Sequence, residues 1–118
     1  MAGVEKLFEN KIKRYLQSKG IYPLGTPKEK MTVKATGYYE KRWGGGIYTK
    51  SGAPDLHIAV NGFNIDAEIK APNGKVSDLQ EFMIDQINCC NCNAMVVYPK
   101  DFEKFKKIIE NCLTLKMT

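Results

Sequence analysis

The sequence lacks long apolar runs and internal repeats, and each absence excludes a class of protein. No stretch approaches the roughly 18 consecutive apolar residues of a membrane span, and the N-terminus is amphipathic and charged, with no visible targeting segment. We therefore expect a soluble, intracellular, cytoplasmic protein with no membrane partner. No repeat or low-complexity tract divides the chain, so residues 1–118 are expected to form a single domain.

Cysteine and histidine are also too few, or wrongly spaced, to build a familiar zinc site. Cys89, Cys90 and Cys92 crowd together and Cys112 stands apart, a spacing that fits neither a CxxC knuckle nor a spread disulfide framework. We expect buried reduced thiols, with a zinc site as the less favoured alternative.

Acidic residues are scarce in the first half of the chain. Residues 1–50 hold eleven Lys and Arg against four acids, whereas residues 51–118 hold seven Lys against nine acids, within a net charge of +5. This asymmetry predicts that the first half meets a polyanion such as nucleic acid, although lysine retained for solubility would explain it equally well.

The clearest positive signal is a β-hairpin. Two alternating runs, Leu56–Val60 and Phe63–Ala67, are separated only by Asn61-Gly62, the dipeptide that favours a type I′ turn because both central residues need φ > 0. The two-residue loop fixes the register, and one face becomes apolar while the other becomes polar. The apolar pairs are Val60–Phe63, Ile58–Ile65 and Leu56–Ala67, and the polar pairs are Ala59–Asn64, His57–Asp66 and Asp55–Glu68.

The polar face of this hairpin predicts a metal site. Asp55 opposite Glu68 places two like charges about 5 Å apart, which is destabilising unless a hard cation such as Mg²⁺ or Mn²⁺ lies between them. Lys70 follows Glu68 by two residues and projects from the same face. His57, the only histidine, is interpreted as the cross-strand partner of Asp66 rather than as a ligand.

Four features at one consistent spacing carry a resemblance to a nuclease family. Gly52-Ala53-Pro54-Asp55, the hairpin, Glu68-Ile69-Lys70-Ala71 and Ser77-Asp78-Leu79-Gln80 together resemble the PD-(D/E)XK superfamily. More closely, they resemble the small stand-alone, phage-type VRR-NUC (virus-type replication-repair nuclease) proteins. The resemblance runs from about Glu5 to about Phe105, and its specificity lies in the combination, since a single D…ExK match is common.

The resemblance implies a restriction-endonuclease-like core and a divalent-metal-dependent DNA endonuclease. Asp55, Glu68 and the main-chain carbonyl of Ile69 would bind Mg²⁺, and Lys70 would orient or help to deprotonate the attacking water. Members of this family act as homodimers on branched DNA, so the resemblance also implies a homodimer and a junction or flap substrate. A catalytically silent DNA-binding or assembly module and an RNA-processing nuclease remain alternatives.

A carboxylate from the first helix is implied by the same resemblance. Apolar residues from Val4 to Leu16 recur at helical spacing, in a helix that ends near Gly20. Glu5 falls inside the apolar stripe and Glu9 at its margin, and a carboxylate that faces inward needs a partner. The resemblance implies that a glutamate of this helix holds the metal or its water, and the spacing to Gly20 and to the Tyr15-Leu16 pair makes Glu5 the better match. Glu9, or an ordinary solvated acid, stays open.

A basic and aromatic segment is the candidate DNA-binding surface. Gly37 to Trp43 reads as an aromatic strand followed by a glycine loop, and Lys41, Arg42 and Lys50 are expected to contact phosphates. Lys75, in the turn after the Glu-x-Lys motif, joins this set. Trp43 either stacks on a base or packs in the core.

The remaining segments complete a mixed α/β fold. Ser77 and Gln80 form a capping box, and the resemblance also places Gln80 beside the active site. The helix that they begin should face inward through Leu79, Phe82, Met83, Ile87 and Cys90.

A short strand is expected at 31–35, a strand buried on both faces at 94–98, and a final helix after Pro99. The predicted order is α-β-β-β-α-β-α, with a central mixed sheet flanked by helices.

Overall fold

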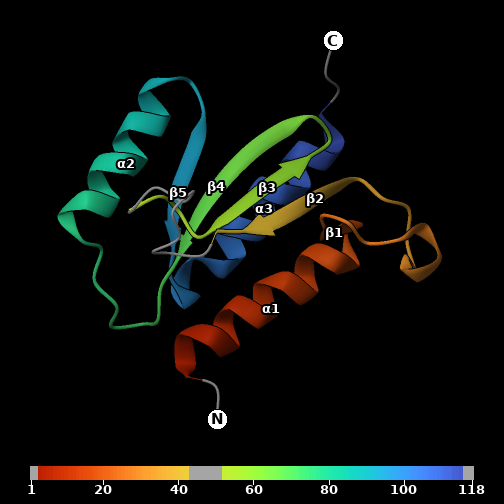
Figure 1. Cartoon of the computed structure of the whole chain (residues 1–118), viewed down its shortest axis with the longest axis horizontal. Helices are drawn as coiled ribbons and strands as arrows, with labels where there is room; N and C mark the ends of the chain where they lie inside the picture. The colour runs from red at the N-terminus through yellow and green to blue at the C-terminus, as the bar shows by residue number, and fades with distance from the viewer. Residues whose placement is uncertain (1–2, 43–51, 116–118) are drawn as a thin grey trace.

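A computed structural model describes residues 3–42 and 52–115. It is a mixed α/β protein in which helices flank a five-stranded sheet (Figure 1). The elements in chain order are α1 (Val4–Ser18), β1 (Ile21–Pro23), the 3-10 helix η1 (Lys28–Lys30), β2 (Gly37–Lys41), β3 (Leu56–Val60), β4 (Phe63–Ile69), α2 (Asp78–Cys89), β5 (Asn93–Val97), the 3-10 helix η2 (Pro99–Asp101) and α3 (Phe102–Thr114).

The sheet keeps the strands in sequence order. β1 is parallel to β2, the strands β2, β3 and β4 are antiparallel neighbours, and β4 is parallel to β5 across the α2 crossover. The expected mixed sheet is thus confirmed, but four strands precede α2 where the predicted order has three, and the short strand was misplaced. The first strand is Ile21–Pro23, whereas residues 31–35 are not a strand. The sequence pattern did not indicate this strand because it contains Pro23, and proline argues against a regular strand.

The hairpin between β3 and β4 has the expected turn and register. Asn61 and Gly62 both have positive φ, of 49° and 85°, as a type I′ turn requires. Val60 pairs with Phe63 and Leu56 with Ala67. The Asn61 side-chain amide also donates to the carbonyl of Cys112 at 2.8 Å, so the turn is tied to the end of α3.

The hydrophobic core fills one face of the sheet, under α1 and α3. Phe8, Ile12 and Leu16 of α1 meet the apolar side of the hairpin, and Phe105 and Ile109 of α3 complete the layer. All of these side chains are 5% exposed or less. Burying them supplies most of the stabilisation, at about 25 cal/mol per Å² of apolar surface. The structure therefore fixes α1 and α3 on the same side of the sheet.

Helix α2 covers the opposite face mainly at β5. It lies beside β5 (Figure 1), and its one buried residue is Ile84. The predicted inward stripe was therefore wrong in part: Leu79 and Phe82 are 48% and 59% exposed, and Cys90 is also exposed. A helix that packs on a single strand buries a narrower stripe than one that packs across a sheet.

Strand β5 is parallel, as expected, but it lies at the edge of the sheet and only Val97 is fully buried. The prediction of burial on both faces was wrong, because an apolar run does not reveal whether a neighbour exists on each side. The Asn88 side chain covers the open edge. Its Oδ1 accepts from Ala94 N at 2.8 Å and its Nδ2 donates to Ala94 O at 3.0 Å.

All four cysteines are free thiols, but only Cys112 is buried. The expectation of buried thiols was wrong for Cys89, Cys90 and Cys92, which lie at the exposed end of α2. Within residues 3–42 and 52–115, no helix has the length and apolar character needed to cross a membrane.

Candidate functional site

Glu68, on β4, is the centre of the candidate site. The residue is 2% exposed, and its Oε2 accepts a hydrogen bond from Gln80 Nε2 at 3.1 Å and lies 3.6 Å from Lys70 Nζ. Its other oxygen, Oε1, is buried and has no hydrogen-bond partner in the described part of the chain. A buried polar atom without a partner is costly, so this oxygen is a vacant acceptor.

Asp55 faces the same site from the segment that leads into β3. The paired ladder ends at Leu56, and the Asp55 Oδ2 accepts from the Ile69 backbone N–H at 3.2 Å. Arg42 holds this segment: its backbone N–H donates to Asp55 O at 2.6 Å, and its Nη1 donates to Pro54 O at 3.1 Å. Two strands therefore position the Asp55 carboxylate.

The Gly-x-Pro-Asp motif has a steric origin. Gly52 has φ +83°, and a Cβ there would lie 2.6 Å from Leu79 Cγ at the start of α2. Only glycine fits both the backbone angle and the close approach. Pro54 is fully buried and restricts the chain just before Asp55. The motif packs the Asp55 segment against the helix that carries Gln80.

The Glu68 carboxyl is poised near neutrality. Burial first, and then the nearby Asp55 carboxylate, raise its pKa from 4.5 to about 7, against the opposing effect of Lys70. A carboxylate shifted by burial and by a second acid marks a functional site more often than a structural one. The expected closeness of Asp55 and Glu68 is thus present, although the two residues are not formal ladder partners.

Gln80 contributes to the helix cap and to the site at once. Its Oε1 accepts from Ser77 N at 2.9 Å, and its backbone N–H donates to Ser77 Oγ at 3.1 Å, which completes the predicted capping box. Its Nε2 is left to bond Glu68. The cap therefore fixes the orientation of the amide that contacts the buried acid.

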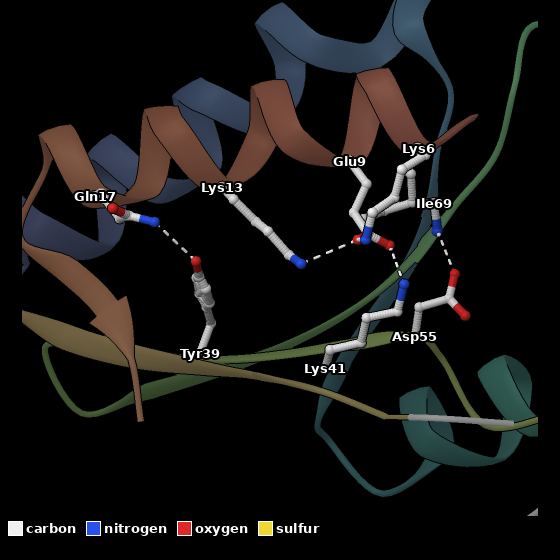
Figure 2. A network of polar contacts seen from close by, with 8 residues as sticks. All are labelled: Lys6, Glu9, Lys13, Gln17, Tyr39, Lys41, Asp55 and Ile69. Atoms are coloured by element: carbon white, nitrogen blue, oxygen red, sulfur yellow. Dashed lines mark hydrogen bonds and ion pairs between the residues drawn. The ribbon is translucent and has the colours of Figure 1, made fainter. Parts of the chain in front are cut away.

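The two acids of α1 are placed the other way round from the prediction. Glu5 is exposed, together with Val4 and Leu7, because the first turn of α1 extends past the packed core. Glu9 is the buried acid, 5% exposed. It forms ion pairs with Lys6, Lys13 and Lys41 (Figure 2). The placement of Glu5 inside the apolar stripe was wrong, and its role at a metal stays a prediction.

The residues predicted to contact DNA fall in different surroundings. Lys41 Nζ donates to Glu9 Oε1 at 2.6 Å, and Arg42 Nη1 lies 3.0 Å from Asp66 Oδ1. Both therefore have protein partners, whereas Lys75 is exposed. Lys50 and Trp43 lie outside the described residues.

The pairing of His57 with Asp66 is confirmed. The His57 Nδ1 lies 2.9 Å from Asp66 Oδ1, the oxygen that also meets Arg42. This group braces the polar face of the hairpin one register step away from Glu68. Because Asp66 is bound by both His57 and Arg42, the contacts support a structural role for the only histidine of the sequence.

Sequence reasoning missed the lysines that surround Glu9. Lys6 and Lys13 stand three residues before and four residues after Glu9, which are the spacings at which helix side chains meet. That spacing was available in the sequence as a signal.

The donor set suits a small divalent cation. Asp55 and Glu68 supply carboxylate oxygens, one of them vacant, and carboxylate oxygens are ligands that Mg²⁺ takes. In residues 3–42 and 52–115, no three His, Cys, Asp or Glu side chains gather at one point. Two carboxylates with water and phosphate oxygens are sufficient for the magnesium sites of phosphoryl-transfer enzymes.

The fold and site together define a mixed α/β protein with a cluster of two carboxylates and a lysine, centred on the buried Glu68, at one end of its sheet. Comparison with protein-family models, curated proteins and solved structures yields no match for the chain.

Proposed function

We propose that this protein is a divalent-metal-dependent DNA endonuclease with a restriction-endonuclease-like core of the VRR-NUC type. The observation that carries the proposal is the buried Glu68 carboxylate, whose vacant oxygen lies in a site shared with Asp55, Lys70 and Gln80. The motif resemblance points to the same residues. Such an arrangement suits a hydrolase that cleaves phosphodiester bonds, because a cation and a lysine can offset the charge of the reacting phosphate.

In this proposal each residue has a defined task. Asp55, Glu68 and the Ile69 carbonyl would hold Mg²⁺ or Mn²⁺, which supplies a charge that polarises the phosphate and lowers the pKa of bound water. Lys70, 13% exposed, would donate to the attacking water or to a phosphate oxygen. Gln80 would keep the Glu68 carboxylate oriented, since its amide is fixed by the helix cap.

Cleavage assays test the assignment directly. The purified chain is incubated with Mg²⁺ or with chelator on duplex, single-stranded, flap and four-way-junction DNA. We expect Mg²⁺-dependent cleavage that Glu68→Ala or Lys70→Ala abolishes, with circular dichroism confirming the fold. Lys107→Ala, an exposed lysine of α3, is the matched control and should cleave normally. Undiminished cleavage by either site variant would refute the assignment.

The substrate panel also tests the finer parts of the proposal. A preference for flap or junction DNA would support structure-selective cleavage by a homodimer, and light scattering measures the number of subunits. A monomeric protein that cleaves all of these DNA substrates equally would contradict both the structure selectivity and the homodimer. RNA substrates of matched sequence separate a deoxyribonuclease from an RNA-processing nuclease.

A catalytically silent DNA-binding or assembly module is the second candidate. The excess of basic residues in the first half of the chain favours it, because that feature needs no catalysis. Calorimetric titration with Mg²⁺ and Mn²⁺ at pH 8 distinguishes the two. Heat of binding that is lost in Glu68→Gln supports the enzyme, whereas DNA binding without metal binding supports the module.

A further inference from the structure

The surroundings of Glu9 contain more positive charge than this buried acid needs. Glu9 Oε2 lies 2.8 Å from Lys6 Nζ and 3.0 Å from Lys13 Nζ, and Glu9 Oε1 lies 2.6 Å from Lys41 Nζ. Figure 2 shows the three ammonium groups converging on the carboxylate from α1 and β2. With one carboxylate and three lysines, the group has a net charge of +2.

This arrangement exceeds what is required to attach α1 to the sheet. One ion pair between Glu9 and Lys41 links the two elements, whereas Lys6 and Lys13 come from the same helix as Glu9 and add no link. Their side chains remain 44% and 23% exposed. Ion pairs within one helix each stabilise by only about 0.3–0.5 kcal/mol at a surface, and because Lys6 and Lys13 both stay in contact with solvent, their ammonium groups can also meet an anion.

The cluster borders an open cavity. A recess of about 330 Å³ is lined by Lys13 and Lys41 together with Pro23, Leu24, Tyr39 and Glu40. Two lysine side chains form one wall of the recess, and Glu40 supplies the only acid there among the described residues. The volume is sufficient for a phosphate group.

The cluster also lies at the same end of the sheet as the candidate site. Lys41 pairs with Leu56, the residue after Asp55, and Arg42, which directly follows β2, donates its backbone N–H to Asp55 O. In Figure 2, Lys41 of β2 and Asp55, in the segment that leads into β3, both project beneath α1. A DNA strand that presents one phosphate to Asp55 and Glu68 would place a flanking phosphate near the lysines.

We propose that Lys6, Lys13 and Lys41, gathered by Glu9, bind a backbone phosphate of the DNA strand next to the one held at Asp55 and Glu68. This inference takes its substrate class from the proposed function. Glu9 acts as a positioning residue: it holds three ammonium groups at one point, which reduces the side-chain entropy lost when they meet a phosphate. The contact recognises the backbone and carries no base specificity.

DNA binding without cleavage provides the test. Anisotropy of a labelled duplex is measured in chelator from 50 to 200 mM salt for the wild type, Lys6→Gln, Lys13→Gln and the control Lys107→Gln. The slope of log K against log salt should become shallower by about 0.9 for each phosphate that a variant no longer neutralises, with a several-fold weaker affinity. Lys107→Gln should match the wild type, and the charge-preserving Lys13→Arg should retain most of the affinity.

The outcomes separate this inference from the proposed function. Weaker DNA binding by the Lys6 and Lys13 variants supports the phosphate site even if no DNA is ever cleaved. If the chain cleaves DNA but both variants bind like Lys107→Gln, the phosphate site is overturned while the nuclease stands. A wild type that does not bind DNA at all overturns the inference as well. Urea unfolding of each variant confirms that weaker binding does not reflect a failure to fold.

Discussion

Replacing Glu68 with glutamine should stabilise the protein at alkaline pH and leave it almost unchanged at acidic pH. Glutamine has the shape of the glutamate, keeps an oxygen for the amide of Gln80, and carries no charge next to Asp55. The substitution therefore removes the ionisation of Glu68 while preserving the packing around it.

The size of the effect follows from the pKa of Glu68. Burial, reinforced by Asp55, raises this pKa from 4.5 to about 7. Below pH 4.5 the group is neutral in the folded and the unfolded chain, so it costs nothing. Above pH 7 it is charged in both states, and holding that charge in the folded protein costs about 3 kcal/mol at about 1.4 kcal/mol per pKa unit. The folded protein is therefore most stable, as far as Glu68 is concerned, while this carboxyl is neutral, and it loses that advantage as the pH rises from 4.5 through 7.

Urea unfolding of both proteins in chelator at pH 4.5 and pH 8 measures the prediction. The free energy of unfolding of Glu68→Gln relative to the wild type should increase by about 3 kcal/mol between the two pH values. Effects of other titrating groups cancel in this difference. A difference that stays constant with pH would refute the raised pKa of Glu68.

Addition of Mg²⁺ extends the same experiment to the metal site. At pH 8 the ion should stabilise the wild type, because it binds the ionised carboxylates of Asp55 and Glu68 and only the folded chain presents them together. At pH 5 the stabilisation should be smaller, since a proton on Glu68 competes with the metal. Equal stabilisation of Glu68→Gln would show that the ion binds elsewhere.

Three further predictions follow from the same contacts. Asp55→Asn should raise the melting temperature in chelator, because it removes the repulsion of Glu68 while an amide oxygen still accepts from the Ile69 N–H; a lower melting temperature would contradict the like-charge contact. Glu9→Gln should lower the free energy of unfolding by about 1–3 kcal/mol at pH 7, because the lysines hold the Glu9 pKa down at about 2. The stabilising effect of the ionised Glu9 is present above pH 4.5 and disappears as the pH falls through 2, so unfolding curves of both proteins measured above pH 4.5 and near pH 2 check the sign. Gly52→Ala should lower the free energy of unfolding by about 1–2 kcal/mol, because its Cβ would clash with Leu79 at positive φ, and a thermal melt equal to that of the wild type would disprove the steric account.

The hairpin and the acids that it carries could be predicted from the sequence. A two-residue Asn61-Gly62 turn permits one register, and the capping box fixes where α2 begins, so the approach of Gln80 to Glu68 follows from local rules and the resemblance together. The closeness of Asp55 to Glu68 depended only on counting residues from the turn. These features are local, which is why the sequence could predict them.

The features that could not be predicted depend on where an element ends relative to its neighbours. Glu5 has the angular position of a core residue, but its turn of α1 extends beyond the packed core, so Glu9 is buried instead. Leu79 and Phe82 are apolar at helical spacing, but α2 packs mainly on β5 and leaves both side chains exposed. Periodicity gives the direction of a side chain and contains no information on what lies in that direction.

The amide of Asn88 has a consequence for assembly. By bonding both polar backbone groups of Ala94, it occupies the position that a sixth strand would take, and at the opposite border β1 is short and contains Pro23. Pairing through the β5 edge would therefore have to displace Asn88, and the short β1 edge offers few backbone groups to a partner strand. A homodimer of this protein would have to associate through helices or loops, and concentrated solutions of it should resist growth into ribbons of continuous sheet.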